Sequence, residues 1–218
     1  MAKAIDIKYN YDVIRIDVKE KILYFSNNSF YKYDELISSI PLNILPYLLS
    51  SPQEILDCAS KLEATSIAIV SLGFNKPTIA KKLWFYVYDE DILFARVYSP
   101  SKKSPHNAPQ GTSSLQAEIY FSKFKPLDSM IDRSKILEHT INCFIKMGIC
   151  KREDIIASDV RIIKYGNVIF NKDMHKNRKK ILDYIESLGI YTIGRFGKWE
   201  YLWSDESFLS GKDMILKI

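Results

Sequence analysis

The residues whose chemistry is most suggestive lie in the last quarter of the chain, between positions 194 and 212. A Gly-Arg pair opens this segment, and the aromatic residues Trp199 and Tyr201 follow it. A helix is expected over 205–216, where Asp205 can cap the first turn and leave backbone amides that attract an anion. A guanidinium group, aromatic rings that look exposed and a helix N-terminus together suit a flat, phosphorylated ligand.

Small residues make one side of the same helix approachable. Ser210 and Gly211 carry little bulk, so a ligand or another backbone can come close to the helix. A purely structural explanation covers the same residues: Gly194 shapes a turn, Trp199 packs in a core, and the small residues meet a neighbouring helix. From residue chemistry alone, both explanations of the segment that begins with Gly194 and Arg195 stay open.

A second set of candidate residues lies on two expected strands in the middle of the chain. Alternation places Arg96 and Tyr98 on the same face of a strand over 92–98. Glu118, on a strand over 115–121, is the expected partner of Arg96 if the two strands are neighbours. An arginine among aromatic residues either pairs with such a carboxylate or recognises an anionic or sugar ligand, and both roles stay open.

Motifs of several common chemistries are absent from the sequence. It contains neither GxGxxG nor GxxxxGK followed by Ser or Thr, the two glycine-rich phosphate loops, and it contains no GxSxG nucleophile turn. The three histidines, His106, His139 and His175, lack the spacing of metal ligands, so no metal site is expected. No self-sufficient catalytic constellation emerges, and the catalytic residues stay unassigned.

Composition and charge are those of an ordinary globular chain. The 218 residues are 47% hydrophobic and 26% charged, which is enough apolar material for a sizeable core. The net charge of +5 permits an anionic ligand, but the densest basic run, 175–180, is expected to be the solvated face of a helix. Three cysteines without a CxxC pair, and no apolar run near the ~20 residues that span a membrane, predict a cytoplasmic protein with reduced thiols. Neither a transmembrane segment nor a nucleic-acid partner is expected.

Hydrophobic periodicity predicts an α+β fold, a mixed and mainly antiparallel sheet with helices packed on it. Strands are expected within 5–25 as a hairpin and at 31–33, 36–40, 67–70, 83–88, 92–98, 115–121, 160–165 and 191–193. The strand at 67–70 is continuously apolar, as is typical of burial on both faces. Helices are expected from a capping box at 51–54 to about residue 61, and at 133–147, 175–188 and 205–216. Gly189 is expected to end the helix at 175–188.

Three of these segments, in this order, resemble the FAD-dependent amine oxidoreductases, and in particular the branch with protoporphyrinogen-oxidase-like polysaccharide enzymes and UDP-galactopyranose mutase. The first is YDELISSIPL at 33–42, where in that family the chain returns from the substrate domain toward the flavin domain. The second comprises the strand with Arg96, a Ser-Pro and Pro-Gly loop, and the strand with Glu118. The third is the segment 193–212. The resemblance covers nearly the whole chain.

The resemblance implies roles for individual residues. In the family, a strand, a Gly-Arg pair, aromatic residues, an acidic residue and a helix with a Ser-Gly pair lie against the isoalloxazine ring of FAD. The positions matched as cofactor-binding are Gly194, Arg195, Trp199, Asp205, Ser210 and Gly211. In the mutase branch the arginine and a tyrosine six residues later bind the substrate diphosphate, which implies that role for Arg195 and Tyr201. The other expected substrate-binding residues are Arg96, Tyr98 and Glu118. The mutase pattern has an acidic residue where this chain has Trp203.

The resemblance also implies that half of such an enzyme is missing from this sequence. Family members begin with a strand, a glycine-rich turn and an acidic ribose-binding residue. We therefore expect FAD only where a missing N-terminal domain or a partner chain completes the site, and no cofactor tightly bound to this chain alone. Three explanations stay open: a truncated frame or expressed domain, one subunit of a split enzyme, or a stand-alone binding domain. The implied partners are a nucleotide sugar or another anionic small molecule, and a dinucleotide-binding subunit or a second copy of the chain.

These expectations combine into one prediction of domains and function. Residues 1–218 are expected to form a single compact unit, with a substrate-domain-like core at 42–165 and flavin-domain-proximal segments at 1–41 and 166–218. The last strand and helix belong to the flavin domain in full-length relatives. The expected function is the substrate-binding half of an FAD-dependent oxidoreductase or nucleotide-sugar mutase-like protein of cell-surface polysaccharide synthesis, incomplete and not catalytic alone. The alternatives are a non-catalytic binding module for an anionic sugar nucleotide and a structural or partner-binding domain.

Overall fold

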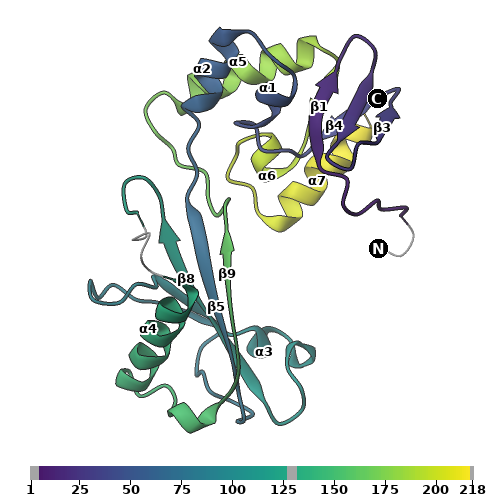
Figure 1. Cartoon of the computed structure of the whole chain (residues 1–218). Coiled ribbons are helices and arrows are strands. Elements are labelled where there is room, and N and C mark those ends of the chain that lie inside the picture. The colour runs from purple at the N-terminus through teal and green to yellow at the C-terminus, as the bar shows by residue number, and fades with distance from the viewer. Residues whose placement is uncertain (1–4, 127–131, 217–218) are drawn as a thin grey trace. The chain divides into compact units, whose positions relative to one another are not determined.

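The structure, a computed structural model, describes residues 5–126 and 132–216 (Figure 1). Its contacts divide the chain into two compact units. Unit 1 comprises Met1–Glu63 and Val168–Ile218, and unit 2 comprises Ala64–Asn167. The expected single unit with a core at 42–165 differs from this division, because residues 42–63 fold with the two ends of the chain.

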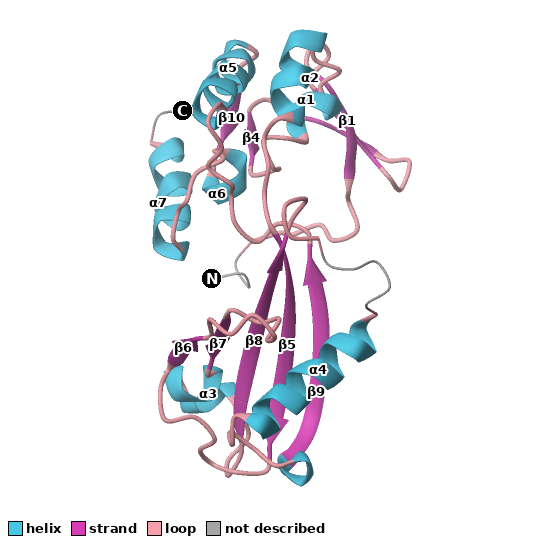
Figure 2. Ribbon diagram, turned by 90° about the vertical axis from the view of Figure 1, so that its left-hand side faces the viewer, coloured by secondary structure: helices cyan, strands magenta, loops and turns pink. Residues whose placement is uncertain are grey.

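Unit 2 is built on an antiparallel sheet with the strand order β6-β7-β8-β5-β9. The strands are β5 (Ser66–Phe74), β6 (Trp84–Tyr86), β7 (Arg96–Tyr98), β8 (Ser113–Phe121) and β9 (Ile155–Ile163). Helix α4 (Arg133–Lys146) lies across this sheet (Figure 2) and buries Ile136 and Phe144 against it. The Phe144 ring meets the Phe94 ring edge-on at 5.3 Å between centroids. This apolar layer covers one face of the sheet.

The strands of unit 2 follow the side-chain alternation of the sequence. Along β5, every second residue from Ala68 to Phe74 is buried in the core. Within 67–70, Ile67, Ala68 and Val70 are buried and Ile69 is partly buried, so the expected burial on both faces holds at Ile67 and Ala68 and is incomplete at Ile69. The Ser-Pro and Pro-Gly loop expected between the strands with Arg96 and Glu118 contains α3 (Pro100–Lys103) and the 3-10 helix η2 (Pro105–Asn107), each begun by a proline. A further 3-10 turn, η3 (Arg152–Asp154), precedes β9.

Unit 1 contains two small sheets and five helices among its described residues. One sheet is antiparallel, with β1 (Val13–Asp17), β2 (Ile22–Phe25) and β3 (Phe30–Lys32) in sequence order. The other pairs β4 (Leu36–Ser38) with β10 (Ile190–Thr192), and these two strands are parallel. The helices are α1 (Leu45–Leu48), α2 (Gln53–Ser60), α5 (Met174–Ser187), α6 (Gly194–Gly197) and α7 (Ser204–Ile215).

Two of the expected helix signals can be compared with the structure. Gly189 has φ +71° just after α5, as expected for a glycine that ends a helix. At α2, however, Pro52 occupies the cap position and no side chain caps the first turn. The Ser51 hydroxyl is buried without a hydrogen-bond partner among the described residues, so the expected capping box was wrong. The helix begins one residue too late for Ser51 to reach its amides.

The predicted fold class is confirmed. Helices pack on mainly antiparallel sheets, which is the α+β arrangement expected from the order of strands and helices. The parallel pair β4–β10 is the exception, and it joins segments that are far apart in the sequence. Within the described residues, no helix has both the length and the apolar character needed to cross a bilayer.

Candidate functional site

Unit 2 places three of the candidate residues on the sheet face opposite α4. Arg96 stands directly across from Glu118 in the register of β7 and β8. The Arg96 Nε donates to Glu118 Oε2 at 2.9 Å, and Nη2 donates to Oε1 at 2.6 Å. Glu118 is only 9% exposed, so this bidentate salt bridge is largely buried on the face of the sheet. The expected Arg96–Glu118 partnership is confirmed.

Tyr120 extends the pair into a network that the sequence interpretation missed. Its hydroxyl donates to Glu118 Oε2 at 2.5 Å. Burial, followed by this contact with Glu118, raises the pKa of Tyr120 to about 12. The hydrogen bonds that Arg96 donates to Glu118 likewise raise the pKa of Arg96 above its usual value. At neutral pH the network therefore holds one cation, one anion and a neutral phenol. Tyr120 follows Glu118 by two residues on β8, so strand alternation was the signal that could have identified it.

Aromatic side chains border this network on the outer strands. Tyr98 lies across from Gln116 on β8 and from Trp84 on β6, and Tyr86 lies across from Arg96. The Gln116 amide donates to Ser71 Oγ at 3.1 Å. The structure thus brings Tyr98, Arg96 and Glu118 onto one face. The charge of Arg96 is already balanced by the Glu118 carboxylate. A role of these three residues in binding a ligand stays a prediction.

Unit 1 joins two of the three segments that carry the resemblance. The Leu42 amide donates to the Phe196 carbonyl at 2.9 Å, and the Ile193 amide donates to the Ser38 carbonyl at 2.9 Å. A Cβ on Gly197 would come within 3.0 Å of the Ser38 carbonyl oxygen. The segment 33–42 and the Gly-Arg segment therefore pack backbone against backbone, and only glycine allows this approach at position 197.

Ser210 ties α7 to the start of the Gly-Arg segment. Its hydroxyl accepts a hydrogen bond from the Gly194 amide at 2.8 Å and donates to the Ser207 carbonyl at 2.7 Å. Gly194 has φ +73°, a left-handed conformation that favours glycine. Ser210 is buried, and its one hydroxyl proton is used in the hydrogen bond to the Ser207 carbonyl. The two residues position α7, and a direct contact of either with a cofactor stays a prediction.

Arg195 and Tyr201 are brought together as a stacked pair. The guanidinium carbon of Arg195 lies 4.3 Å from the centroid of the Tyr201 ring, a cation–π contact. The Glu200 amide donates to the Arg195 carbonyl at 2.8 Å and closes the intervening turn. Tyr201 is 51% exposed, so the pair lies at the surface of unit 1.

Trp199 departs from the surface position suggested by the sequence. It is fully buried, and its ring meets Phe196 edge-on at 6.1 Å between centroids. The backbone of Trp199 has φ +53°, an uncommon conformation for a residue other than glycine, which turns the chain after α6. The indole fills the core of unit 1, as the structural explanation of this residue requires. A flavin contact through Trp199 is not supported by this position.

Asp205 does not cap α7. Trp203 occupies the cap position, and the Glu206 carboxylate accepts a hydrogen bond from the Trp203 amide at 2.7 Å. The Ser207 amide donates to the Trp203 carbonyl at 2.8 Å, so it is bound within the helix. Asp205 and Glu206 place two carboxylates in the first turn of α7, and these would repel an anion. The expectation of an anion site at this helix N-terminus is therefore not supported.

Gly211 stands apart from the other glycines of the segment. A Cβ added there would meet only Ile193 Cδ1, at the ordinary contact distance of 3.6 Å. Packing within unit 1 therefore does not require glycine at 211. Its small size is instead compatible with the approach of another molecule to α7.

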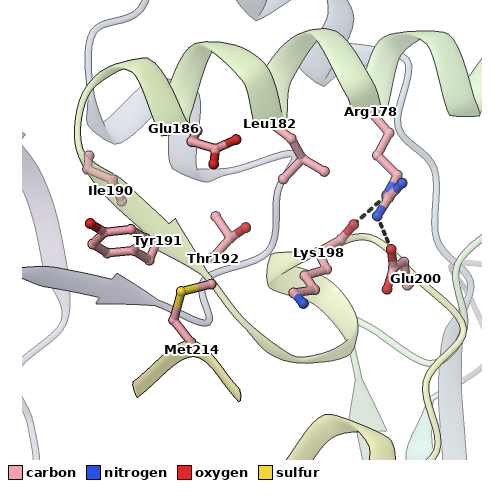
Figure 3. Close-up of a pocket in the computed structure, with 9 residues that line it drawn as sticks. All are labelled: Arg178, Leu182, Glu186, Ile190, Tyr191, Thr192, Lys198, Glu200 and Met214. Atoms are coloured by element: carbon pink, nitrogen blue, oxygen red, sulfur yellow. Dashed lines mark hydrogen bonds and ion pairs between the residues drawn. The ribbon is translucent and has the colours of Figure 1, made fainter. Parts of the chain in front are cut away.

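A cavity of about 190 Å³ lies beside β10 in unit 1 (Figure 3). Leu182 of α5 and Met214 of α7 line it from opposite sides. At one end, Arg178 donates through Nε to the Lys198 carbonyl at 2.6 Å and pairs through Nη2 with Glu200. The sequence interpretation did not identify this cavity, since it is formed by helices and a strand that come together only in the fold.

Cys143 and His139 are neighbours on α4 but do not form a nucleophile pair. The Sγ and Nε2 atoms lie 3.5 Å apart, and the same nitrogen accepts the Leu93 amide at 3.1 Å. Burial lowers the pKa of His139 and raises the pKa of Cys143. The lone pair that would accept the thiol proton already accepts the Leu93 amide, and the raised pKa of Cys143 favours the protonated thiol.

Comparisons with known proteins agree with this fold. No family model matches the chain. The structure of reduced UDP-galactopyranose mutase is 26% identical with a TM-score of 0.87, over 99% of this chain and 47% of that one. A putative protoporphyrinogen oxidase from Exiguobacterium sp. 255-15 is 14% identical with a TM-score of 0.72, over 95% and 46%. A CLA-producing fatty acid isomerase from P. acnes is 13% identical with a TM-score of 0.63, over 95% and 47%. The chain spans about half the length of these structures and shares the fold of that half.

Proposed function

We propose that this chain is the substrate-binding part of an FAD-dependent oxidoreductase or nucleotide-sugar mutase-like protein of cell-surface polysaccharide synthesis. One observation carries the proposal: the fold follows that of UDP-galactopyranose mutase over 99% of the chain, at 26% identity. The order of the three resembling segments supports the same assignment. Because the likeness covers 47% of that enzyme and no glycine-rich dinucleotide loop occurs in the sequence, the proposed part is not catalytic alone.

The residues of α7 and its surroundings fit one side of a flavin site. Gly211 leaves the helix open to close approach, and the hydrogen bond from Gly194 to Ser210 fixes the position of that helix. The rest of the proposed cofactor set fits less well, since Trp199 is buried and Asp205 does not cap the helix. When bound, FAD would supply the redox-active isoalloxazine ring. The pyrophosphate of FAD would need the dinucleotide-binding part.

Arg195 and Tyr201 are the proposed anchor of the substrate phosphates. Stacking on Tyr201 orients the guanidinium plane, and a guanidinium is suited to binding phosphate oxygens two at a time through the N–H groups of its edge. The stacking also limits the rotamers of a long side chain before the ligand arrives, which reduces the entropy lost on binding. This pair therefore binds and orients the substrate in our proposal.

Arg96, Glu118 and Tyr98 are the proposed substrate residues of unit 2. The Arg96–Glu118 pair is neutral as a whole but still presents hydrogen-bonding groups beside Tyr98. Such an arrangement suits a polar, uncharged group of the substrate better than a second phosphate, because a phosphate would lie near the Glu118 carboxylate.

The cysteines Cys58, Cys143 and Cys150 are free thiols. Because reduced cysteines are typical of the cytoplasm, this is the location that we propose.

Thermal-shift measurements with UDP-galactose test the proposed binding. We expect the nucleotide sugar to raise the unfolding midpoint of the full chain in a concentration-dependent way, because a ligand of the folded state stabilises it. Arg195→Ala should abolish the shift. The matched control Arg152→Ala removes an exposed arginine paired with Glu138 and should leave the shift unchanged. A wild-type chain that responds to no nucleotide sugar contradicts the proposal.

A flavin titration tests the incompleteness of the site. We expect FAD added to the isolated chain to leave flavin absorbance and fluorescence close to those of free FAD. A stoichiometric yellow complex of sub-micromolar affinity would show instead that this chain holds the cofactor by itself.

One observation favours the alternative of a non-catalytic binding module. Trp203 occupies the position where the mutase pattern has an acidic residue, and its side chain is 67% exposed. A binding module should bind UDP-galactose without converting it when a reduced flavin and a dinucleotide-binding partner are supplied. Conversion under those conditions would rule the module out.

A further inference from the structure

A second cavity in unit 1 is lined by none of the residues to which a function has been assigned above. Its volume is about 330 Å³, at the lower end of the range of small-molecule sites. The lining comprises residues 15–19 of β1 and the following turn, Leu49 and Ser50 after α1, and Tyr184 and Leu188 at the end of α5. The cavity thus shares no residue with the Gly-Arg segment at 193–212 or with the network around Arg96.

Arg15 gives this cavity an oriented guanidinium group. It stands across from Tyr24 in the register of β1 and β2, and its guanidinium carbon lies 3.8 Å from the centroid of the Tyr24 ring. Arg15 Nη1 lies 3.7 Å from Asp17 Oδ2, an ion pair that is too long for a hydrogen bond. Within the described residues, no acceptor takes a hydrogen bond from the Arg15 side chain, so its N–H groups remain available to a ligand.

Lys19 adds a second positive charge to the lining. Its side chain is exposed, and no carboxylate of the part of the chain that the structure describes pairs with it. Asp17 is the one carboxylate among the described lining residues, and its Oδ1 accepts the Glu20 amide at 3.0 Å. Two cations and one anion leave one positive charge in excess, which favours an anionic ligand.

The rest of the lining is largely apolar. Leu49 is buried, and Val18, Tyr184 and Leu188 are half-buried. Burial of apolar surface against such side chains is favourable for a ligand with an apolar body, and the Tyr184 ring also suits an aromatic group. A few charged groups within a mainly apolar cavity are typical of small-molecule sites, where the charges fix the orientation of the ligand.

We infer that this cavity binds a small organic carboxylate with an apolar or aromatic body. The forked N–H groups of Arg15 match the two oxygens of a carboxylate, and Lys19 contributes a point charge beside them. The body of the ligand packs against Leu49, Tyr184 and Leu188. Because stacking on Tyr24 already orients Arg15, little of its side-chain freedom is lost on binding.

A phosphate ester fits the same lining less well. A phosphate monoester carries nearly two negative charges at neutral pH, whereas the lining has one positive charge in excess. Asp17 lies close to Arg15 and would repel the additional charge. The single charge of a carboxylate is therefore the better match.

Titration of the full chain with phenylpropionate, followed by the NMR shifts of its backbone amides, tests the inference. We expect saturable shifts of the amides of Val18, Lys19 and Ser50, with a dissociation constant on the order of 1 mM. Phenylpropionamide has the same body without the charge, and acetate has the charge without the body. Each should bind at least about tenfold more weakly. Phenylethyl phosphate, which has a body of similar length, should also bind more weakly than phenylpropionate.

Substitutions then test the two cations separately. Arg15→Gln keeps a polar side chain without the guanidinium, and it should raise the dissociation constant at least about tenfold. Lys19→Gln removes a more exposed charge and should raise it about threefold. Lys32→Gln is the matched control, since Lys32 is an exposed lysine of β3 that does not line the cavity, and it should leave the constant unchanged. Unchanged amide shifts elsewhere in each free variant show that the chain is folded.

The inference is overturned if phenylpropionate shifts none of the amides of Val18, Lys19 and Ser50, or only amides around Arg195. Equal or tighter binding of phenylpropionamide or of phenylethyl phosphate also overturns it. So does a folded Arg15→Gln chain that binds as well as the wild type, or a Lys32→Gln chain that binds as weakly as Arg15→Gln. Arg195→Ala should leave binding at this cavity unchanged, so the inference and the proposed function can fail independently of each other.

Discussion

Arg96 in unit 2 and Arg195 in unit 1 are both arginines near a tyrosine, but they are held in different ways. Arg96 makes a two-pronged pair with Glu118, and Tyr120 binds the same carboxylate. Arg195 instead stacks its guanidinium on the half-exposed ring of Tyr201. The first arginine is fixed by an opposite charge on the neighbouring strand, and the second by the face of an aromatic ring after a short helix.

This difference separates residues that support the fold from residues suited to a ligand. A carboxylate buried in a sheet surface depends on its cation, so Arg96 contributes to the stability of unit 2 whatever it binds. A cation–π contact at the surface contributes little to stability and keeps the hydrogen-bonding edge of the guanidinium oriented. We therefore expect mutation to affect mainly stability in the first case and mainly binding in the second.

Removal of Arg96 should have the largest effect on stability. Arg96→Ala leaves the Glu118 carboxylate, which is 9% exposed, without its cation, and should lower the free energy of unfolding of unit 2 by about 2–3 kcal/mol. Arg195→Ala should lower that of unit 1 by less than about 1 kcal/mol. Hydrogen exchange of the amides of β8 and α7 measures the two units separately. Equal losses from both substitutions would contradict the distinction.

Gly197→Ala should cause the second largest loss of stability, and it tests the comparison within unit 1. The new Cβ would lie 3.0 Å from the Ser38 carbonyl oxygen and 3.2 Å from Ser39 Cα, so the backbone must shift. Overpacking of this kind costs about 1–3 kcal/mol. We expect a lower unfolding midpoint, with weaker protection of the amides in β10. A variant as stable as the wild type would mean that the approach of the two backbones is not required.

The stability of unit 2 should fall in alkaline solution because of Tyr120. Its pKa is raised to about 12 in the folded state, whereas an unfolded tyrosine titrates near ~10. The unfolded chain loses this proton first, so the contribution is fully present below ~10 and is lost as the pH rises toward about 12. Tyr120→Phe should flatten the decline of the unfolding midpoint between these values. An unchanged slope in the variant would contradict the network.

Gly211→Ala should have the smallest effect on the isolated chain. The new Cβ meets only Ile193 Cδ1 at 3.6 Å, and alanine favours helix over glycine by up to about 1 kcal/mol. The unfolding midpoint should stay unchanged or rise slightly. In the assembled protein the same substitution should weaken FAD binding, because the added methyl group lies where we place the flavin. Destabilisation of the isolated chain would return Gly211 to a packing role.

Much of this arrangement could be predicted from local patterns. Alternation along the strands placed Arg96 with Tyr98 and identified Glu118 as the partner of Arg96, because strands of an antiparallel sheet bring such positions face to face. The helices at 133–147 and 175–188 followed from their apolar spacing, and the end of the second from Gly189. The spacing of apolar residues and the glycine that ends a helix are local properties, and both can be seen directly in the sequence.

The remaining features depend on contacts between distant segments. Trp199 looked like a surface aromatic, but a left-handed backbone at a residue other than glycine turns it into the core. Asp205 looked like a helix cap, but the helix starts one residue earlier, at Ser204. The expected start of the core at residue 42 differs from the start of unit 2 at Ala64, because residues 42–63 belong to the unit that also contains Val168–Ile218. The parallel pairing of β4 with β10 has no local signal.

The central claim is that Arg195 belongs to a binding site for a nucleotide sugar, and titration calorimetry tests it most directly. UDP-galactose is titrated into the full wild-type chain and into Arg195→Ala, with Arg152→Ala as the control. The account predicts saturable binding to the wild type and to the control, and a dissociation constant at least about tenfold higher for Arg195→Ala. No heat of binding with the wild type, or the same dissociation constant for all three chains, would contradict it.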